Sequence, residues 1–112
     1  MKEIYLYKTA SGREIIKEFI DRQNEVSKGR IRNGFRILEK HGLEISKNRS
    51  VKKIAKEPDV FELRIVGTKQ IRILFSDYDR NTYLVVHIFI KKSQKTLLKE
   101  IKLAQKRINE FI

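Results

Sequence analysis

The sequence predicts an α+β fold, because the spacing of its hydrophobic residues changes period along the chain. Between residues 15 and 40 apolar side chains recur every three or four positions, which is the period of an amphipathic helix. From residue 61 they alternate with polar ones, as in a strand, and helical spacing returns after residue 96. At 112 residues with 40% hydrophobic side chains, the chain is expected to form a single domain over residues 1–112.

The first half begins with a short apolar and aromatic run at residues 4–7, which predicts a strand. The tetrapeptide at 11–14 matches the capping box S-x-x-E, in which Ser11 and Glu14 satisfy free backbone N–H groups, so a helix is expected to begin there. A second helix is predicted over residues 26–40. It ends at Gly42, since glycine readily takes the left-handed conformation that closes a helix.

The second half contains two alternating runs, at 61–66 and 71–75, on either side of residues 67–70. They predict an antiparallel hairpin. Residues 83–90 are apolar on both faces, which is expected of a strand in the interior of a sheet.

A C-terminal helix is predicted over residues 97–111, where apolar residues are spaced by three or four, with Ser93 or Thr96 as its cap. Residues 51–54 are too short a run to assign. The predicted order of elements is therefore β-α-α-β-β-β-α.

The hairpin strands place their apolar residues at odd positions, so Arg64 and Arg72 are expected to share the other face. With a three-residue loop at 67–69 the two arginines stand directly opposite each other, a like-charge pair that normally destabilises a sheet. Such a pair is easier to explain if an anion lies between the two guanidinium groups.

The following strand carries aliphatic residues at even positions from 84 to 90, and we assign this side to the helices. That assignment places His87 and Lys91 on the open face with the two arginines. Lys92 and Lys95 are expected at its rim.

The net charge of +12 is concentrated in two segments. Residues 27–56 hold ten basic and two acidic side chains, and residues 87–112 hold seven and two. This distribution is typical of a surface for a polyanion such as RNA or DNA, although a membrane surface or an acidic protein also qualifies. Lys47, Lys52 and Lys53 in the first segment are candidates for binding an RNA backbone or form a solvated patch.

The residues needed for other kinds of catalytic or metal site are missing from the sequence. Cysteine is absent, His41 and His87 are the two histidines, and there is no carboxylate pair with acid–base spacing and no phosphate-binding glycine loop. We therefore expect no metal and no cofactor. The N-terminus has no apolar signal core and no run reaches the length of a membrane span, which predicts a soluble, cytoplasmic protein.

The same residues also have structural explanations. Arg64 and Arg72 are compatible with solvated strand positions paired with Glu62 or Asp77, and His87 with a half-buried histidine that has no catalytic role. The three lysines at 91, 92 and 95 are compatible with a solvated helix start, although cations there oppose the helix dipole.

The chain resembles the HigB-like branch of the RelE and ParE superfamily of bacterial and phage toxins. The resemblance rests on E-L-R-I at 62–65, R-I-L-F at 72–75 and H-x-F-x-K-K-S-Q-K-T at 87–96, followed by E-I at 100–101 and A-x-x-R at 104–107. It implies an antiparallel sheet preceded by two helices and closed by a third. Two departures stand out: Leu97 replaces a usual proline, and the tyrosine of some relatives has no counterpart.

The resemblance further implies a toxin of a toxin–antitoxin system that cleaves mRNA in the ribosomal A site and is neutralised by a helix-turn-helix, HigA-like antitoxin. Arg64 matches a phosphate-binding position, Arg72 the arginine that stabilises the cleaved phosphate, and Lys91 or Lys92 the basic residue at the end of the last strand. The alternatives are a ParE-like inhibitor of DNA gyrase and a non-enzymatic nucleic-acid-binding module.

The cleavage chemistry can be stated from the residues. Attack by a ribose 2′-OH needs proton removal, stabilisation of the charged phosphorane and protonation of the leaving oxygen. Clustered cations serve the second step and lower one another's pKa, which brings an amine within range for proton transfer. The candidates for proton transfer are therefore a lysine and His87, and no metal is required.

Overall fold

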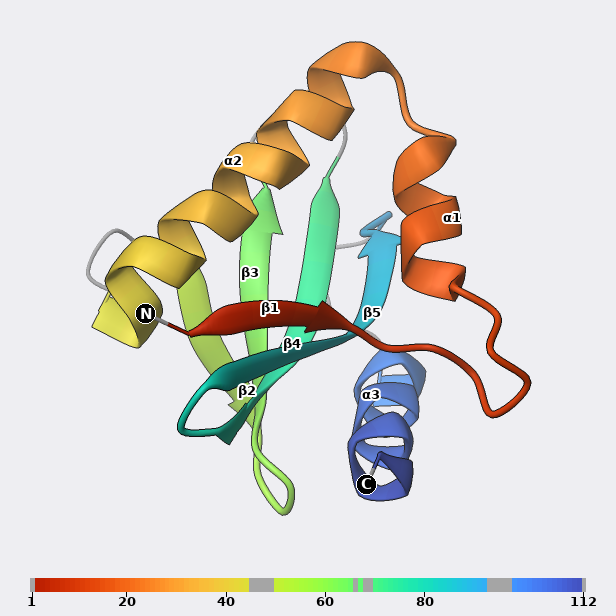
Figure 1. Ribbon diagram of the computed structural model, residues 1–112, viewed down its shortest axis with the longest axis vertical. Helices are drawn as coiled ribbons and strands as arrows, with labels where there is room; N and C mark the ends of the chain where they lie inside the picture. The colour runs from red at the N-terminus through yellow and green to blue at the C-terminus, as the bar shows by residue number, and fades with distance from the viewer. Residues whose placement is uncertain (1, 45–49, 66, 68–69, 93–97, 112) are drawn as a thin grey trace.

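A computed structural model describes residues 2–44, 50–65, 67, 70–92 and 98–111 of the chain. They form an α+β fold, as predicted, with a five-stranded sheet and three helices (Figure 1). The elements in chain order are β1 (Glu3–Leu6), α1 (Ile15–Asp21), α2 (Glu25–His41), β2 (Val51–Ala55), β3 (Val60–Ile65), β4 (Ile71–Asp79), β5 (Thr82–Ile90) and α3 (Leu98–Glu110).

The sheet differs from the predicted one in two ways. Its strand order is β1-β5-β4-β3-β2, and β1 pairs in parallel with β5, so the sheet is mixed and not purely antiparallel. The predicted order of elements also omitted β2, which pairs antiparallel with β3. The short run V-K-K-I-A lacks a clear alternation, and it becomes a strand because Val51 pairs with Leu63 of β3.

The two faces of the sheet are covered by different helices. Gly34 of α2 lies close to Ile65, since a Cβ at Gly34 would stand 2.7 Å from the Ile65 Cδ1 atom, so α2 packs on the face opposite Arg64. In Figure 1, α1 and α2 form an arch on this side, with α3 apart from them. On the other face, which we call the arginine face, Glu100 of α3 contacts His87.

Strand β5, which lies between β1 and β4, contains a bulge that changes which residues share a face. The pairing with β4 shifts from Leu74–His87 to Phe75–Val85, leaving Val86 as the extra residue. Leu84 consequently lies opposite Ser76 on the arginine face. The prediction that the aliphatic residues at even positions of this strand share the face covered by α1 and α2 is therefore wrong at Leu84, because a bulge has no signal in a uniformly apolar run.

The core fills the space on both sides of the sheet. Its largest fully buried side chains include Phe75, Leu63, Ile73, Leu84 and Leu38, and α3 contributes Ala104 and Ile108. The helical and strand periodicities thus identified its main contributors. In the part of the chain that the structure describes, no helix is long and apolar enough to cross a membrane.

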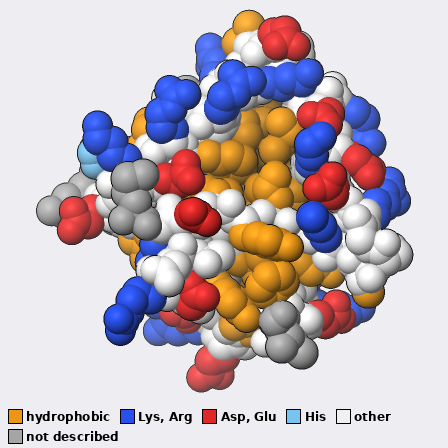
Figure 2. All heavy atoms as spheres, in the orientation of Figure 1, with side chains coloured by type: hydrophobic (Ala, Val, Ile, Leu, Met, Phe, Trp, Pro, Cys, Tyr) orange, Lys and Arg blue, Asp and Glu red, His pale blue; other side chains and the backbone are white. Residues whose placement is uncertain are grey.

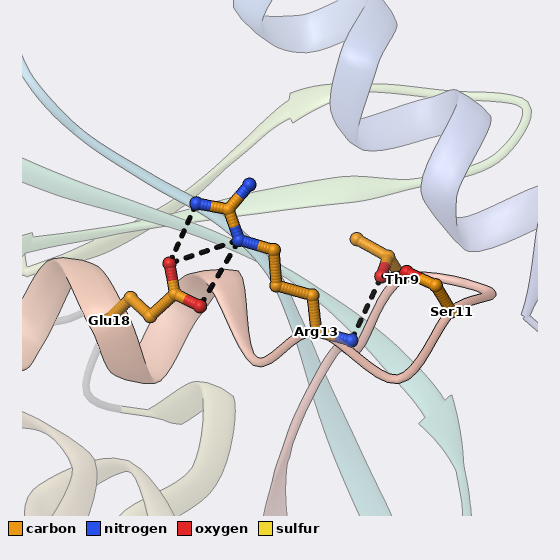
Figure 3. A network of polar contacts seen from close by, with 4 residues as sticks. All are labelled: Thr9, Ser11, Arg13 and Glu18. Atoms are coloured by element: carbon orange, nitrogen blue, oxygen red, sulfur yellow. Dashed lines mark hydrogen bonds and ion pairs between the residues drawn. The ribbon is translucent and has the colours of Figure 1, made fainter.

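The predicted capping box at residues 11–14 does not form. Helix α1 starts at Ile15, with Glu14 as its cap residue and no capping side chain. Ser11 instead contacts the Thr9 hydroxyl, which accepts a hydrogen bond from the Arg13 backbone N–H at 3.0 Å, while the Arg13 guanidinium binds Glu18 (Figure 3). The loop before α1 is thus held by contacts among its own residues, and Ser11 is not used as a helix cap.

Helix α2 ends as predicted, at Gly42, whose φ of 63° is left-handed and whose N–H donates to the Leu38 carbonyl. Its start is fixed by Asn24, whose side chain accepts a hydrogen bond from the Ser27 N–H at 2.8 Å. Helix α3 agrees with the predicted helix, and its predicted caps Ser93 and Thr96 lie outside the described residues.

Candidate nucleic-acid interface

Arg64 of β3 and Arg72 of β4 stand directly opposite each other in the sheet, as the parity of the hairpin predicted. Their environments differ: Arg64 is exposed, whereas Arg72 is only 5% exposed. Both line a hollow of about 240 Å³ at the turn between the two strands, together with Ile65, Gly67 and Gln70. We call it the arginine hollow.

Arg72 is held in this hollow by its neighbours in sequence. Its Nη2 donates to the Gln70 side-chain oxygen at 2.9 Å and its Nη1 to the Ile71 carbonyl at 3.2 Å. The backbone N–H of Lys91, just after β5, donates to the Gln70 carbonyl at 2.7 Å. Gln70 therefore ties the start of β4 to the end of β5 and brings the Lys91 backbone to the arginine hollow.

A buried carboxylate lies behind Arg72. Glu62 is 2% exposed, and its Oε1 is 3.9 Å from Arg72 Nε, close enough for an ion pair but too far for a hydrogen bond. Among the described residues, neither Glu62 Oε2 nor Arg72 Nε has a hydrogen-bond partner. The structural alternative, in which Arg72 pairs with Glu62, therefore holds only in part.

The electrostatics of Arg72 follow from this position. Burial lowers the pKa of Arg72, the charge of Glu62 opposes that shift, and the charge of Arg64 adds to it. A guanidinium remains protonated throughout the physiological range. Arg72 is thus a buried cation with incomplete compensation, which favours an incoming anion.

His87 shares the arginine face, because it lies opposite Leu74 and two residues from Phe89, which is opposite Arg72. An open face was predicted there. The face is instead covered by α3, so this prediction is wrong. His87 Nε2 is 2.7 Å from Glu100, and its Nδ1 is 3.5 Å from Arg107 Nη1. Burial lowers the pKa of His87, while Glu100 opposes this shift and Arg107 reinforces it.

The candidate lysines are divided between the two faces. Lys52 lies opposite Glu62 and so on the arginine face, where it is exposed. Lys53 lies opposite Phe61 on the other face and forms an ion pair with Asp59 at 2.9 Å. Lys92 is exposed just beyond β5, while Lys47 and Lys95 lie outside the described residues.

Cationic side chains also line helix α2. Figure 2 shows Lys and Arg side chains along this helix, above a hollow in which hydrophobic side chains are visible between α2, α1 and β1. Among the described residues there is no group of three His, Cys, Asp or Glu side chains that could hold a metal ion. Basic side chains thus line α2 on the face that Figure 2 shows.

No role was predicted from the sequence for Gln70, and Glu100 and Arg107 entered the prediction only as members of the motifs E-I at 100–101 and A-x-x-R at 104–107. Arg107 donates to the Val86 carbonyl at 2.8 Å and lies over the Tyr7 ring at 5.3 Å, so it links α3, β5 and the segment after β1. The one available signal was the motif A-x-x-R at 104–107, since a cation three residues after a buried alanine faces the sheet.

The fold and the paired arginines define a small α+β protein with a hollow at one end of its sheet that is lined by two guanidinium groups. The chain belongs to the family described as phage-derived protein Gp49-like (DUF891), whose model matches residues 18–109. This is a toxin-like family of the RelE and HigB type. Among curated proteins, none matches the sequence significantly.

Proposed function

We propose that this protein is the toxin of a type II toxin–antitoxin system and acts as a HigB-like endoribonuclease on mRNA in the A site of cytoplasmic ribosomes. The observation that carries the proposal is the pair Arg64 and Arg72, opposite in the sheet and lining one hollow. An RNA phosphate between them would relieve their mutual repulsion. Membership of a toxin-like family of the RelE and HigB type supports the same activity.

The proposed reaction uses the ribose 2′-OH as nucleophile. Arg72 would stabilise the charge that develops on the phosphorane, because a buried cation acts in a medium of low dielectric constant and needs little reorganisation. Arg64, which is exposed, would bind the incoming phosphate. Our candidates for proton transfer are Lys91, whose backbone N–H is bonded to Gln70 of the hollow, and its neighbour Lys92, and the proposed chemistry needs no metal.

We assign His87 to positioning and not to proton transfer. Both of its ring nitrogens face partners on α3, Glu100 and Arg107, and the low pKa that burial imposes favours the neutral ring. A residue in this position orients α3 over the arginine face.

The proposed protein partner is a helix-turn-helix antitoxin of the HigA type. The hydrophobic side chains left visible beside α2 in Figure 2 are suited to such a partner, as is the net charge of +12 if the antitoxin is acidic.

The test is primer extension on mRNA from a translating extract supplied with purified protein. We expect wild type to produce new 5′ ends within codons, and Arg72→Ala to lose at least about 100-fold in cleavage rate, the loss typical of removing a group that stabilises the transition state. Ribosome binding, measured by co-sedimentation, should change far less.

The matched control is Arg80→Ala, since Arg80 is an exposed arginine in the turn between β4 and β5, away from the hollow. It should cleave like wild type. If wild type leaves mRNA intact but blocks DNA gyrase supercoiling, the protein is a gyrase inhibitor. If it does neither and only binds RNA, it is a binding module.

A further inference from the structure

A groove of about 290 Å³ adjoins the arginine hollow. Its floor and one wall come from β3 and the residue before β2, namely Leu63, Arg64, Ile65 and Ser50, and its other wall from α2. Among the described residues, the pairing of β2 with β3 begins at Val51 and Leu63, and the Ser50 carbonyl then accepts a hydrogen bond from the Arg64 N–H at 2.8 Å. The groove lies where this pairing stops, beside Ile65 at the end of β3.

The groove and the arginine hollow lie on either side of the end of β3 and share two lining residues. Arg64 and Ile65 line both of them. Helix α2 also reaches both, because Arg30 lines the groove and its Nη1 lies 2.6 Å from where a Cβ on Gly67 would stand. A ligand held by its phosphate in the arginine hollow thus has the groove next to it.

The groove has the chemistry of a site for a flat heterocycle. Ile37, Leu63 and Ile65 supply apolar walls, and Gly34 lets Ile65 pack against α2, since a Cβ there would stand 2.7 Å from the Ile65 Cδ1 atom. Asn33 offers an amide donor and acceptor, and Ser50 a hydroxyl. Unpaired bases in RNA are recognised by stacking on side chains together with hydrogen bonds to their edges.

Size and charge favour one base over a larger occupant. A volume of about 290 Å³ lies at the lower limit of small-molecule sites. The flanking Arg64 carries the charge that a neighbouring phosphate needs.

We propose that this groove binds a nucleobase of the RNA whose phosphate occupies the arginine hollow, and that Asn33 and Ser50 read its edge. The inference rests on the proposed function for its biological meaning. The binding itself can be tested without ribosomes or cleavage.

The first experiment is an NMR titration of isotopically labelled wild-type protein with the four nucleoside 5′-monophosphates and with ribose 5-phosphate. Ribose 5-phosphate should shift the amides of Gly67 and Gln70 alone. At least one nucleotide should also shift those of Gly34 and Ser50, because the base enters the groove. If Gly34 and Ser50 do not respond to any nucleotide, the inference is wrong. If the antitoxin shifts them instead, the groove belongs to that partner and the inference also falls.

The second experiment sequences the cut ends of mRNA for Asn33→Ala and for Asn81→Ala, a matched change at an exposed asparagine in the β4–β5 turn. Asn33→Ala should alter the base preference beside the cut at least about threefold, while Asn81→Ala matches wild type in base preference and in total cleavage. An unchanged base preference in Asn33→Ala overturns the role of Asn33. If wild type cuts nothing, the proposed function fails, and the titration still decides the groove.

Discussion

The pair of Glu62 and Arg72 sets the local balance between stability and binding. Both side chains are buried, yet they are 3.9 Å apart and each leaves an atom without a hydrogen bond among the described residues. A buried carboxylate stabilises a buried guanidinium in the free protein. It also weakens the attraction of that guanidinium for an external anion.

We therefore predict that Glu62→Gln lowers the free energy of unfolding by about 2 kcal/mol, since it leaves Arg72 buried without a counter-charge. The same change should tighten the binding of inorganic phosphate or a short RNA several-fold. Urea denaturation and calorimetric titration measure the two effects. Weaker anion binding by a folded Glu62→Gln would show that Glu62 orients Arg72 and does not compete for it.

A second prediction concerns His87 and the dependence of the free energy of unfolding on pH. Burial lowers the pKa of His87 in the folded protein, so the unfolded state binds the proton more readily below about pH 6.5. This contribution to stability is complete above that pH and is lost as the pH falls, by at most about 1.4 kcal/mol for each pH unit. Burial is the largest cause of this lowered pKa, while Glu100 opposes the shift and Arg107 adds to it.

Urea unfolding at pH 7.5 and pH 5.5 checks this. His87→Gln should lose less stability than wild type on acidification, whereas His41→Gln, at the exposed end of α2, should lose as much as wild type. An equal loss in wild type and His87→Gln would mean that the histidine titrates alike in the folded and unfolded states.

At the scale of elements, helix α2 has glycines in two different roles, one inside the helix and one at its C-terminal end. Gly29 lies inside the helix, and a Cβ there would meet nothing within 4 Å. Gly42 ends the helix with a φ of 63°, and a Cβ there would stand 3.0 Å from the Tyr83 hydroxyl. The first glycine weakens the helix, and the second closes it.

Gly29→Ala is expected to raise the free energy of unfolding by about 0.8 kcal/mol, because alanine has the higher helix propensity. Gly42→Ala should lower it by about 1 kcal/mol or more, through backbone strain and the crowded Tyr83 hydroxyl. Thermal or urea unfolding of the two variants measures both changes. Opposite signs are required, and changes of the same sign would contradict the assigned roles.

At the scale of the whole molecule, the net charge of +12 attracts any polyanion, so overall affinity for RNA says little about where the RNA lies. A comparison of Lys52 and Lys53 distinguishes the effect of net charge on RNA binding from the effect of where a lysine lies. They are adjacent and both exposed, but Lys52 is on the arginine face and Lys53 is on the other face, paired with Asp59.

We predict that Lys52→Gln reduces the salt dependence of single-stranded RNA binding by about 0.7 in the slope of log K against log salt, the value for one phosphate contact. Lys53→Gln should leave the slope unchanged. Fluorescence anisotropy at several salt concentrations measures it. Equal effects of the two variants would indicate that net charge alone governs binding.

Features that depend on neighbouring residues could be predicted from local patterns. Hydrophobic period distinguishes helix from strand within a few residues, and a side-chain alternation of two places Arg64 opposite Arg72 once the turn is recognised. The glycine end of α2 follows from the same local rules. The class of fold and the central pair of the candidate site were therefore predictable.

Features that depend on contacts between distant segments could not be predicted and became known from the assembled fold. The parallel pairing of β1 with β5, the existence of β2 and the bulge in β5 all arise from partners far along the chain. The same is true of His87, which became a contact for α3, and of Arg72, whose burial beside Glu62 no local pattern specifies. Burial is a property of the assembled layers, since it is the packing of one element on another that removes a side chain from water.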